Sequence, residues 1–167
     1  MFGCPSPSRQ SLQNSRSNPP TCISTNTTCW SYIVLADLRQ LMNGWRSTDE
    51  SVTVLTCAIT QVADAHKCID GLVLNAGVLE PICRIGSTET TLDQWKHHFD
   101  VNFFSLVPAI QAALPALRRS PRGGRIVFVS SGAAIKGSPG WGPYNASKAA
   151  MNSLCRYIRS FCSAPIL

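Results

Sequence analysis

Three residues near the carboxyl end of the chain have the types and the spacing for proton transfer: Ser131, Tyr144 and Lys148. Tyr144 and Lys148 form a Tyr-x-x-x-Lys pair, and residues four apart on a helix share one face. An ammonium group held near a phenol favours the ionised form of the phenol, so that the phenol can exchange protons near neutral pH. The pattern therefore predicts redox chemistry on carbonyl and alcohol groups.

Two predicted strands end at small or polar residues. The run 69–74 (IDGLVL) indicates a buried strand that ends at residues 75–77 (NAG), and the run 125–129 (RIVFV) ends at Ser130 and Ser131. The second run is β-branched and aromatic, which is typical of a parallel strand covered on both faces. Because ligands of open parallel sheets bind beyond the carboxyl ends of the strands, both endings are candidate site positions.

Helices are predicted between these strands. Thr48 has the position of an N-cap with two acids after it, and it opens a helix that continues to about Lys67. Thr91 and Gln94 form a capping box at the start of a long helix, roughly residues 92–118.

Three prolines bear on the helices. Pro108 and Pro115 lie inside the long helix and are expected to bend it or break it locally, whereas Pro143 is well placed to open a last helix with Tyr144 and Lys148. The alternation of strands and helices predicts an α/β fold.

The amino-terminal part gives weaker signals. Residues 1–29 are rich in Ser, Thr, Asn and Pro and are expected to form a flexible leader. The run 30–42 is apolar enough for a strand or a short helix, and its length does not decide between them. We therefore leave residues 1–47 unassigned and predict the folded domain over residues 48–167.

Four short motifs together resemble the short-chain dehydrogenase/reductase family: LNAGV, the FDVNFF segment around Asn102, VFVSSGAA and YNASKAA. They occur in the family's order and in the expected structural contexts, from about Thr48 to about Arg156. Within the family, the chain is most similar to fungal sepiapterin-reductase-like and benzil-reductase-like enzymes. The resemblance implies an incomplete Rossmann-like, doubly wound parallel sheet.

The resemblance also implies roles for four residues, each with a plainer alternative. Tyr144 is the expected general acid and base, or a buried helix tyrosine. Lys148 favours the ionised phenol and binds the nicotinamide ribose, or is a surface lysine. Ser131 holds the substrate oxygen, or caps a turn. Asn102 supports a water-linked proton path to the lysine, or is a structural asparagine that bends its helix.

The cofactor expected from the resemblance is NADP, with NAD left open. Asn75, Ala76 and Gly77 match the strand-end motif that lines the adenosine side of the cofactor, where small residues allow close approach. Tyr144 and Lys148 are the other expected cofactor contacts. The expected substrate is a small carbonyl or alcohol, and the family's homodimer through the central helices is one expectation.

The chain departs from the family at both ends. No T-G-x-x-x-G-x-G turn for the pyrophosphate is present, since Gly3 and Gly44 are the only glycines before Ile69. The sequence is expected to be a truncated or divergent member, or a gene model with wrong flanking segments. The rival hypothesis to an oxidoreductase is a non-catalytic remnant or interaction module that does not bind the cofactor.

Composition and charge narrow the function classes. The chain has 167 residues, 44% of them hydrophobic, which fits one globular domain, and its net charge is +6. The last acidic residue is Asp100, and four arginines lie between 118 and 125, where cations suit a helix end. A solvated surface explains them better than nucleic-acid binding, which needs interleaved aromatic residues, and a basic binding protein is the weakest hypothesis.

The cysteines and histidines suggest no metal site. The eight cysteines are scattered without a C-x-x-C pair, which disfavours both a zinc site and a disulfide framework. We expect reduced thiols in the cytoplasm and no apolar run long enough to cross a membrane. His97 and His98 point in different directions on a helix and are expected to be ordinary, partly exposed histidines.

Overall fold

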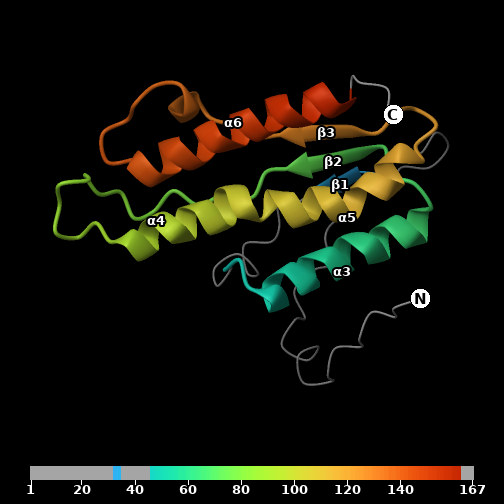
Figure 1. Cartoon of the computed structure of the whole chain (residues 1–167), viewed down its shortest axis with the longest axis horizontal. Coiled ribbons are helices and arrows are strands. Elements are labelled where there is room, and N and C mark those ends of the chain that lie inside the picture. The colour runs from blue at the N-terminus through green and yellow to red at the C-terminus, as the bar shows by residue number, and fades with distance from the viewer. Residues whose placement is uncertain (1–31, 35–45, 163–167) are drawn as a thin grey trace.

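The computed structural model describes residues 32–34 and 46–162. Three parallel strands form one sheet in the order β1 (Tyr32–Val34), β2 (Gly71–Leu74) and β3 (Arg125–Phe128). Helices α3 (Asp49–His66), α5 (Leu106–Arg118) and α6 (Gly142–Cys162) lie along one face of this sheet (Figure 1). The predicted α/β class, as an incomplete parallel sheet, is therefore confirmed.

Strand β1 lies within the amino-terminal part that the sequence left unassigned. It pairs with β2, with Ile33 opposite Leu72. The run 30–42 thus contributes a strand at residues 32–34, and its remaining residues, like residues 1–29, lie outside the described part of the chain. The domain boundary near residue 48 stays a prediction.

The first helices begin where their capping residues predicted. The Thr48 hydroxyl accepts a hydrogen bond from the Ser51 N–H at the start of α3. Helix α4 (Leu92–Phe99) begins with a complete capping box, in which Thr91 accepts from the Gln94 N–H and the Gln94 side chain accepts from the Thr91 N–H.

A π-helical turn, η1 (Asp100–Phe104), separates α4 from α5. Its mark is the Ser105 N–H, which donates across five residues to the Asp100 carbonyl at 3.0 Å. The predicted long helix is therefore interrupted before either proline. Pro108 lies in the first turn of α5 and Pro115 inside that helix, so the interruption comes from the extra residue around Asn102.

The core lies between the sheet and the three helices. Its largest fully buried apolar side chains come from α3, β2, α5 and α6 and from the residues beside them: Ile59, Ile69, Leu72, Leu74, Val101, Leu106 and Met151. Each such side chain contributes about 1.5–3 kcal/mol when it leaves water. This shared core fixes α6 against β3 and the π-helical turn.

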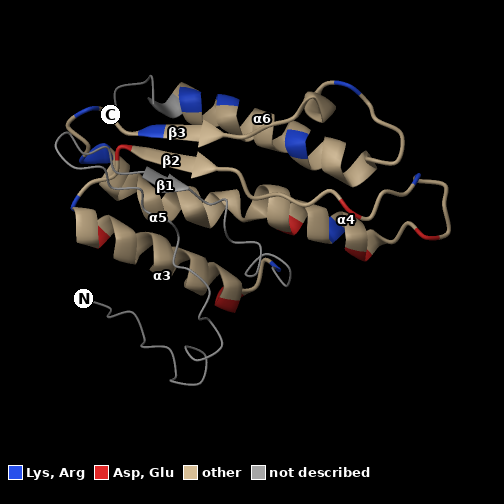
Figure 2. Cartoon of the chain, turned by 180° about the vertical axis from the view of Figure 1, so that it is seen from behind, with Lys and Arg blue, Asp and Glu red and all other residues tan. Residues whose placement is uncertain are grey.

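Strand β3 is covered on one face only within the described part of the chain. Ile126 and Phe128 pack against the core, whereas Val127 and Val129 on the other face are 50% and 37% exposed. Figure 2, which views the chain from behind, shows the sheet on this side with no described helix across it. The expectation that both faces of this strand are covered is wrong for these residues.

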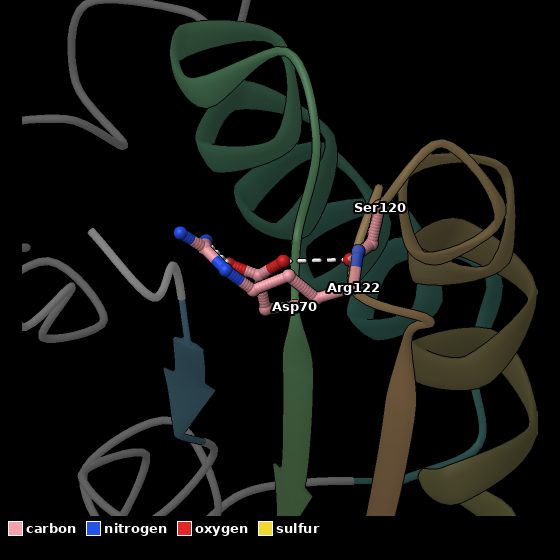
Figure 3. A network of polar contacts seen from close by, with 3 residues as sticks. All are labelled: Asp70, Ser120 and Arg122. Carbon is pink, nitrogen blue, oxygen red and sulfur yellow. Dashed lines mark hydrogen bonds and ion pairs between the residues drawn. The ribbon is translucent and has the colours of Figure 1, made fainter. Parts of the chain in front are cut away.

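A buried carboxylate joins the amino ends of β2 and β3 (Figure 3). Asp70, 2% exposed, accepts a hydrogen bond from the Ser120 hydroxyl at 2.6 Å and lies 3.5 Å from the Arg122 guanidinium. The Arg125 N–H donates to the Asp70 carbonyl. Part of the basic group that follows α5 therefore has a structural role. It acts at the amino ends of β2 and β3, whereas the candidate site residues follow the carboxyl ends of these strands.

One segment passes the length and hydropathy criteria for a membrane span. In the described part of the chain it covers Leu92–Arg118, where an 18-residue window has a mean hydropathy of 1.3, so the expectation that no run is long enough is wrong by these two criteria. In the fold, α5 packs against α3 and β2, as the core helix of a globular domain does. The cellular compartment stays a prediction.

Candidate functional site

The segments after β2 and β3 leave the sheet at the same edge. The two strands are parallel neighbours with Leu74 opposite Phe128, and the Val129 N–H donates to the Leu74 carbonyl at 3.0 Å. Residues 75–77 and Ser131 therefore follow the two strands at the same edge of the sheet. Both strand endings were predicted as candidate site positions. Helix α6 and the π-helical turn pack against each other beside this edge.

Asn102 lies in the π-helical turn and is fully buried. Its side-chain oxygen accepts from the Val78 N–H at 2.7 Å, and its side-chain nitrogen donates to the Val78 carbonyl at 2.9 Å. The same nitrogen donates to the Ser147 hydroxyl at 3.0 Å. One amide group thus ties the segment after β2 to helix α6.

Ser147 also belongs to this buried polar group, although the sequence did not single it out. It is fully buried, accepts from Asn102, and donates to the Tyr144 carbonyl at 2.9 Å. The signal was present in YNASK, because a serine three residues after Tyr144 lies on the same side of the helix. Through Ser147, the first turn of α6 is fixed to the π-helical turn.

Lys148 is 3% exposed and donates from Nζ to the Val129 carbonyl at 2.9 Å. Burial disfavours its charged form and lowers the pKa of Lys148 below its usual value of 10.5. Its ammonium nitrogen lies 5.8 Å from the centre of the Tyr144 ring. The structure therefore brings the predicted Tyr and Lys together on one face of α6.

The Tyr144 ring is half-buried and packs against Trp141. The two ring centres are 5.8 Å apart with planes at 89°, an edge-to-face arrangement that aromatic pairs favour. Trp141 thus limits the positions open to the Tyr144 ring.

Ser131 follows β3 and caps a short 3-10 turn, η2 (Gly132–Ala134), by accepting from the Ala133 N–H at 3.2 Å. The turn packs against α6. The capping role foreseen as the plainer alternative is therefore present. That bond uses a lone pair of the hydroxyl oxygen, so the hydroxyl proton can still be donated to another group.

Gly77 lies between the two buried polar residues. A Cβ atom at this position would lie 3.3 Å from Asn102 Oδ1 and 3.5 Å from Lys148 Nζ. Asn75 is exposed, and Ala76 packs against the core. The predicted strand-end motif therefore borders the Lys148 amine, and a small residue at position 77 keeps that space open.

The two histidines of α4 have different surroundings. His97 is half-buried and its ring contacts the Arg46 guanidinium, whereas His98 is 0% exposed. The expectation of two partly exposed histidines is therefore wrong for His98. The segment after β2 folds over α4 at this point, and the Leu79 carbonyl lies 2.9 Å from His98 Nε2. Among the described residues, no group of three or more potential metal ligands occurs.

Comparison with known proteins finds relatives that are named as reductases or oxidoreductases. The chain is 45% identical over 104 residues to benzil reductase ((S)-benzoin forming) IRC24 of Saccharomyces cerevisiae, which covers 61% of this chain and 40% of that protein. It is 42% identical over 120 residues to the uncharacterized oxidoreductase YIR035C of the same yeast, covering 68% and 46%.

Solved structures of short chain dehydrogenases also resemble this chain. The crystal structure of YIR035C has a TM-score of 0.58 and 36% identity, covering 74% of this chain and 51% of that one. A short chain dehydrogenase from Escherichia coli CFT073 complexed with NADPH has a TM-score of 0.56 and 28% identity, covering 65% and 45%.

The chain spans about half of the length of these relatives, or less. Residues 44–162 match the family model described as short chain dehydrogenase. Because this match takes in well over half of the chain, the protein belongs to the short chain dehydrogenase family.

Proposed function

We propose that the chain carries the catalytic side of an oxidoreductase that moves a hydride between a nicotinamide cofactor and a small carbonyl or alcohol. The observation that supports this most is the buried network from Val78 through Asn102 and Ser147 to Tyr144, with Lys148 beside it. These bonds fix the backbone of α6 at Tyr144 and Ser147, the turn from which the phenol and the amine extend.

The residues present fit the nicotinamide ribose end of such a cofactor. The Lys148 ammonium has three N–H groups and gives one to Val129, so two can bind ribose hydroxyls. The space that a Cβ at Gly77 would fill is next to this amine. When bound, the nicotinamide supplies or accepts the hydride. The NADPH-bound relative supports NADP, with NAD as the other candidate.

Side chains of the protein donate and accept the proton that accompanies the hydride. In reduction, the Tyr144 hydroxyl gives its proton to the carbonyl oxygen, and the Ser131 hydroxyl donates a hydrogen bond to the same oxygen. The nearby Lys148 ammonium favours the phenolate that is left. In oxidation of an alcohol, Tyr144 takes the proton.

The sequence predicts that Asn102 supports a water-linked proton path to Lys148 or is a structural asparagine. Its side-chain oxygen and nitrogen are engaged with Val78 and Ser147. We therefore assign its side chain the task of holding these two neighbours, while a water-linked proton path to Lys148 past this turn stays part of the proposal.

A ketone substrate tests the function. The relative named benzil reductase makes benzil a reasonable choice, and consumption of NADPH by the purified chain is the measurement. Tyr144→Phe keeps the ring packing on Trp141 and removes the proton, so we expect the rate to fall by about 100-fold or more. Tyr157→Phe, at a 59% exposed position, is the control and keeps the rate. Full activity in Tyr144→Phe contradicts the mechanism.

The second candidate is a non-catalytic interaction module with the same fold. The observation in its favour is that the printed sequence contains no T-G-x-x-x-G-x-G turn for a pyrophosphate. A chain that unfolds cooperatively but shows no saturable binding of NADPH supports this candidate, and saturable binding excludes it.

A further inference from the structure

His98 is a buried titratable group that the proposed chemistry does not use. It is 0% exposed, and both ring nitrogens contact carbonyl oxygens: Nδ1 lies 2.8 Å from the Gln94 carbonyl and Nε2 lies 2.9 Å from the Leu79 carbonyl. Gln94 is one turn earlier on α4, whereas Leu79 belongs to the segment that follows β2. The ring therefore bridges a helix and the loop beside the site.

The loop partner of His98 adjoins the loop partner of Asn102. Val78 exchanges two hydrogen bonds with the Asn102 side chain, and the next carbonyl, that of Leu79, faces His98. His98 and Asn102 are four residues apart, one on α4 and one in the π-helical turn. Two consecutive loop residues are thus held by side chains from successive turns.

We propose that His98 is a positioning residue: its Nε2–H donates to the Leu79 carbonyl and so holds the Val78–Leu79 segment in place beside Asn102 and Lys148. The inference rests on the proposed function in one respect only, namely that Lys148 binds a cofactor. The segment matters because Gly77 precedes it directly and borders both Asn102 Oδ1 and Lys148 Nζ. A shift of the segment therefore changes the space beside the Lys148 amine.

The donor assignment follows from the partners. A carbonyl oxygen only accepts, so each of the two contacts is a hydrogen bond only if its ring nitrogen carries a proton, and the Leu79 contact requires that proton on Nε2. In the described part of the chain, no other donor reaches the Leu79 carbonyl. The Gln94 carbonyl lies within α4, where the backbone ladder also supplies a donor. The loop contact therefore depends on His98 more than the helix contact does.

The first test reads the ring directly in the full chain without cofactor. In a chain labelled with ¹⁵N-histidine, a long-range ¹H–¹⁵N spectrum reports which ring nitrogens carry protons, and the His98 signals are those that disappear in His98→Gln. We expect a protonated Nε2. An unprotonated Nε2 overturns the inference, whatever the outcome for oxidoreductase activity.

The second test separates the effect of the hydrogen-bond donor at position 98 from the effect of the volume of the side chain. His98→Leu removes the donor, whereas the amide of His98→Gln can still donate to the Leu79 carbonyl. We expect His98→Leu to speed hydrogen exchange of the Val78 amide by about 5-fold or more relative to amides of α5, and His98→Gln to restore most of the protection. The Lys148 ε-methylene signal should move in His98→Leu.

His97→Leu is the matched control, because it changes the adjacent histidine on the same helix. It should leave the Val78 amide and the Lys148 signal unchanged. Equal effects of His97→Leu and His98→Leu, or wild-type exchange of Val78 in His98→Leu, overturn the inference. If His98→Leu fails to fold, the inference is tested by the Nε2 signal of the wild-type chain and by hydrogen exchange in His98→Gln. Neither measurement places an apolar side chain at this buried site. None of these readouts needs NADPH, so they stand apart from a failure of the proposed function.

Discussion

Asn102 donates a hydrogen bond to Ser147 across 3.0 Å, between the π-helical turn and helix α6, and both side chains are fully buried. This bond connects the two halves of the site. Asn102 also holds Val78 after β2, and Ser147 also holds the carbonyl of Tyr144. Ser147→Ala tests this connection, because it leaves a buried N–H of Asn102 without its partner.

We expect Ser147→Ala to lower the free energy of unfolding by about 1–3 kcal/mol, the cost of an unsatisfied buried donor. Denaturation by urea measures it. Ser160→Ala is the control, since Ser160 also donates to the carbonyl three residues earlier but is exposed. Equal losses of unfolding free energy in the two variants contradict this role of Ser147.

The pH dependence of stability should carry a contribution from Lys148. Burial lowers its pKa in the folded chain below the unfolded value of 10.5, so the unfolded chain binds more protons between the two values. The cost of burying the charge is complete below the folded pKa and disappears as the pH rises toward 10.5. Stability therefore gains from this group as the pH rises through that window.

Lys148→Met should remove this gain, and the difference in unfolding free energy between wild type and variant should change with pH over the window. Lys136→Met, at an exposed lysine, is the control for the loss of one lysine side chain. Parallel curves for wild type and Lys148→Met contradict the assignment.

Gly124 is packed directly against the end of helix α5. An added Cβ would meet the Leu117 carbonyl and lie 2.7 Å from the Leu117 Cβ, so backbone must move. We expect Gly124→Ala to lower the free energy of unfolding by about 3 kcal/mol, the upper end for overpacking. Gly137→Ala meets nothing within 4 Å and should change it by about 0.5 kcal/mol or less. Thermal unfolding of both variants measures the contrast.

Local signals in the sequence predicted the local structure well. Thr48, Thr91 and Gln94 cap helices in the structure because capping depends on a few neighbouring residues. The Tyr144–Lys148 pairing was predictable for the same reason, since helical spacing alone brings the two side chains to one face.

The features that the sequence did not reveal depend on distant packing. No side chain marks the π-helical turn at Asn102, and the burial of His98 arises from a loop some twenty residues earlier in the chain. Ser147 gains its role only when Asn102 reaches it across 45 positions of sequence. The open face of β3 depends on which elements accompany the sheet, which strand composition alone does not specify.

Binding of the cofactor is the most direct test of the central claim, that the site at Lys148 holds a nicotinamide nucleotide. Purified chain is titrated with NADPH while the nicotinamide fluorescence is followed, for wild type, Lys148→Met and the exposed control Lys136→Met. The account predicts saturable binding that Lys148→Met weakens by about 10-fold or more, as for the loss of hydrogen bonds from a charged group, and that Lys136→Met leaves unchanged. Absence of saturable binding by the wild-type chain, or equal affinity in Lys148→Met, contradicts it.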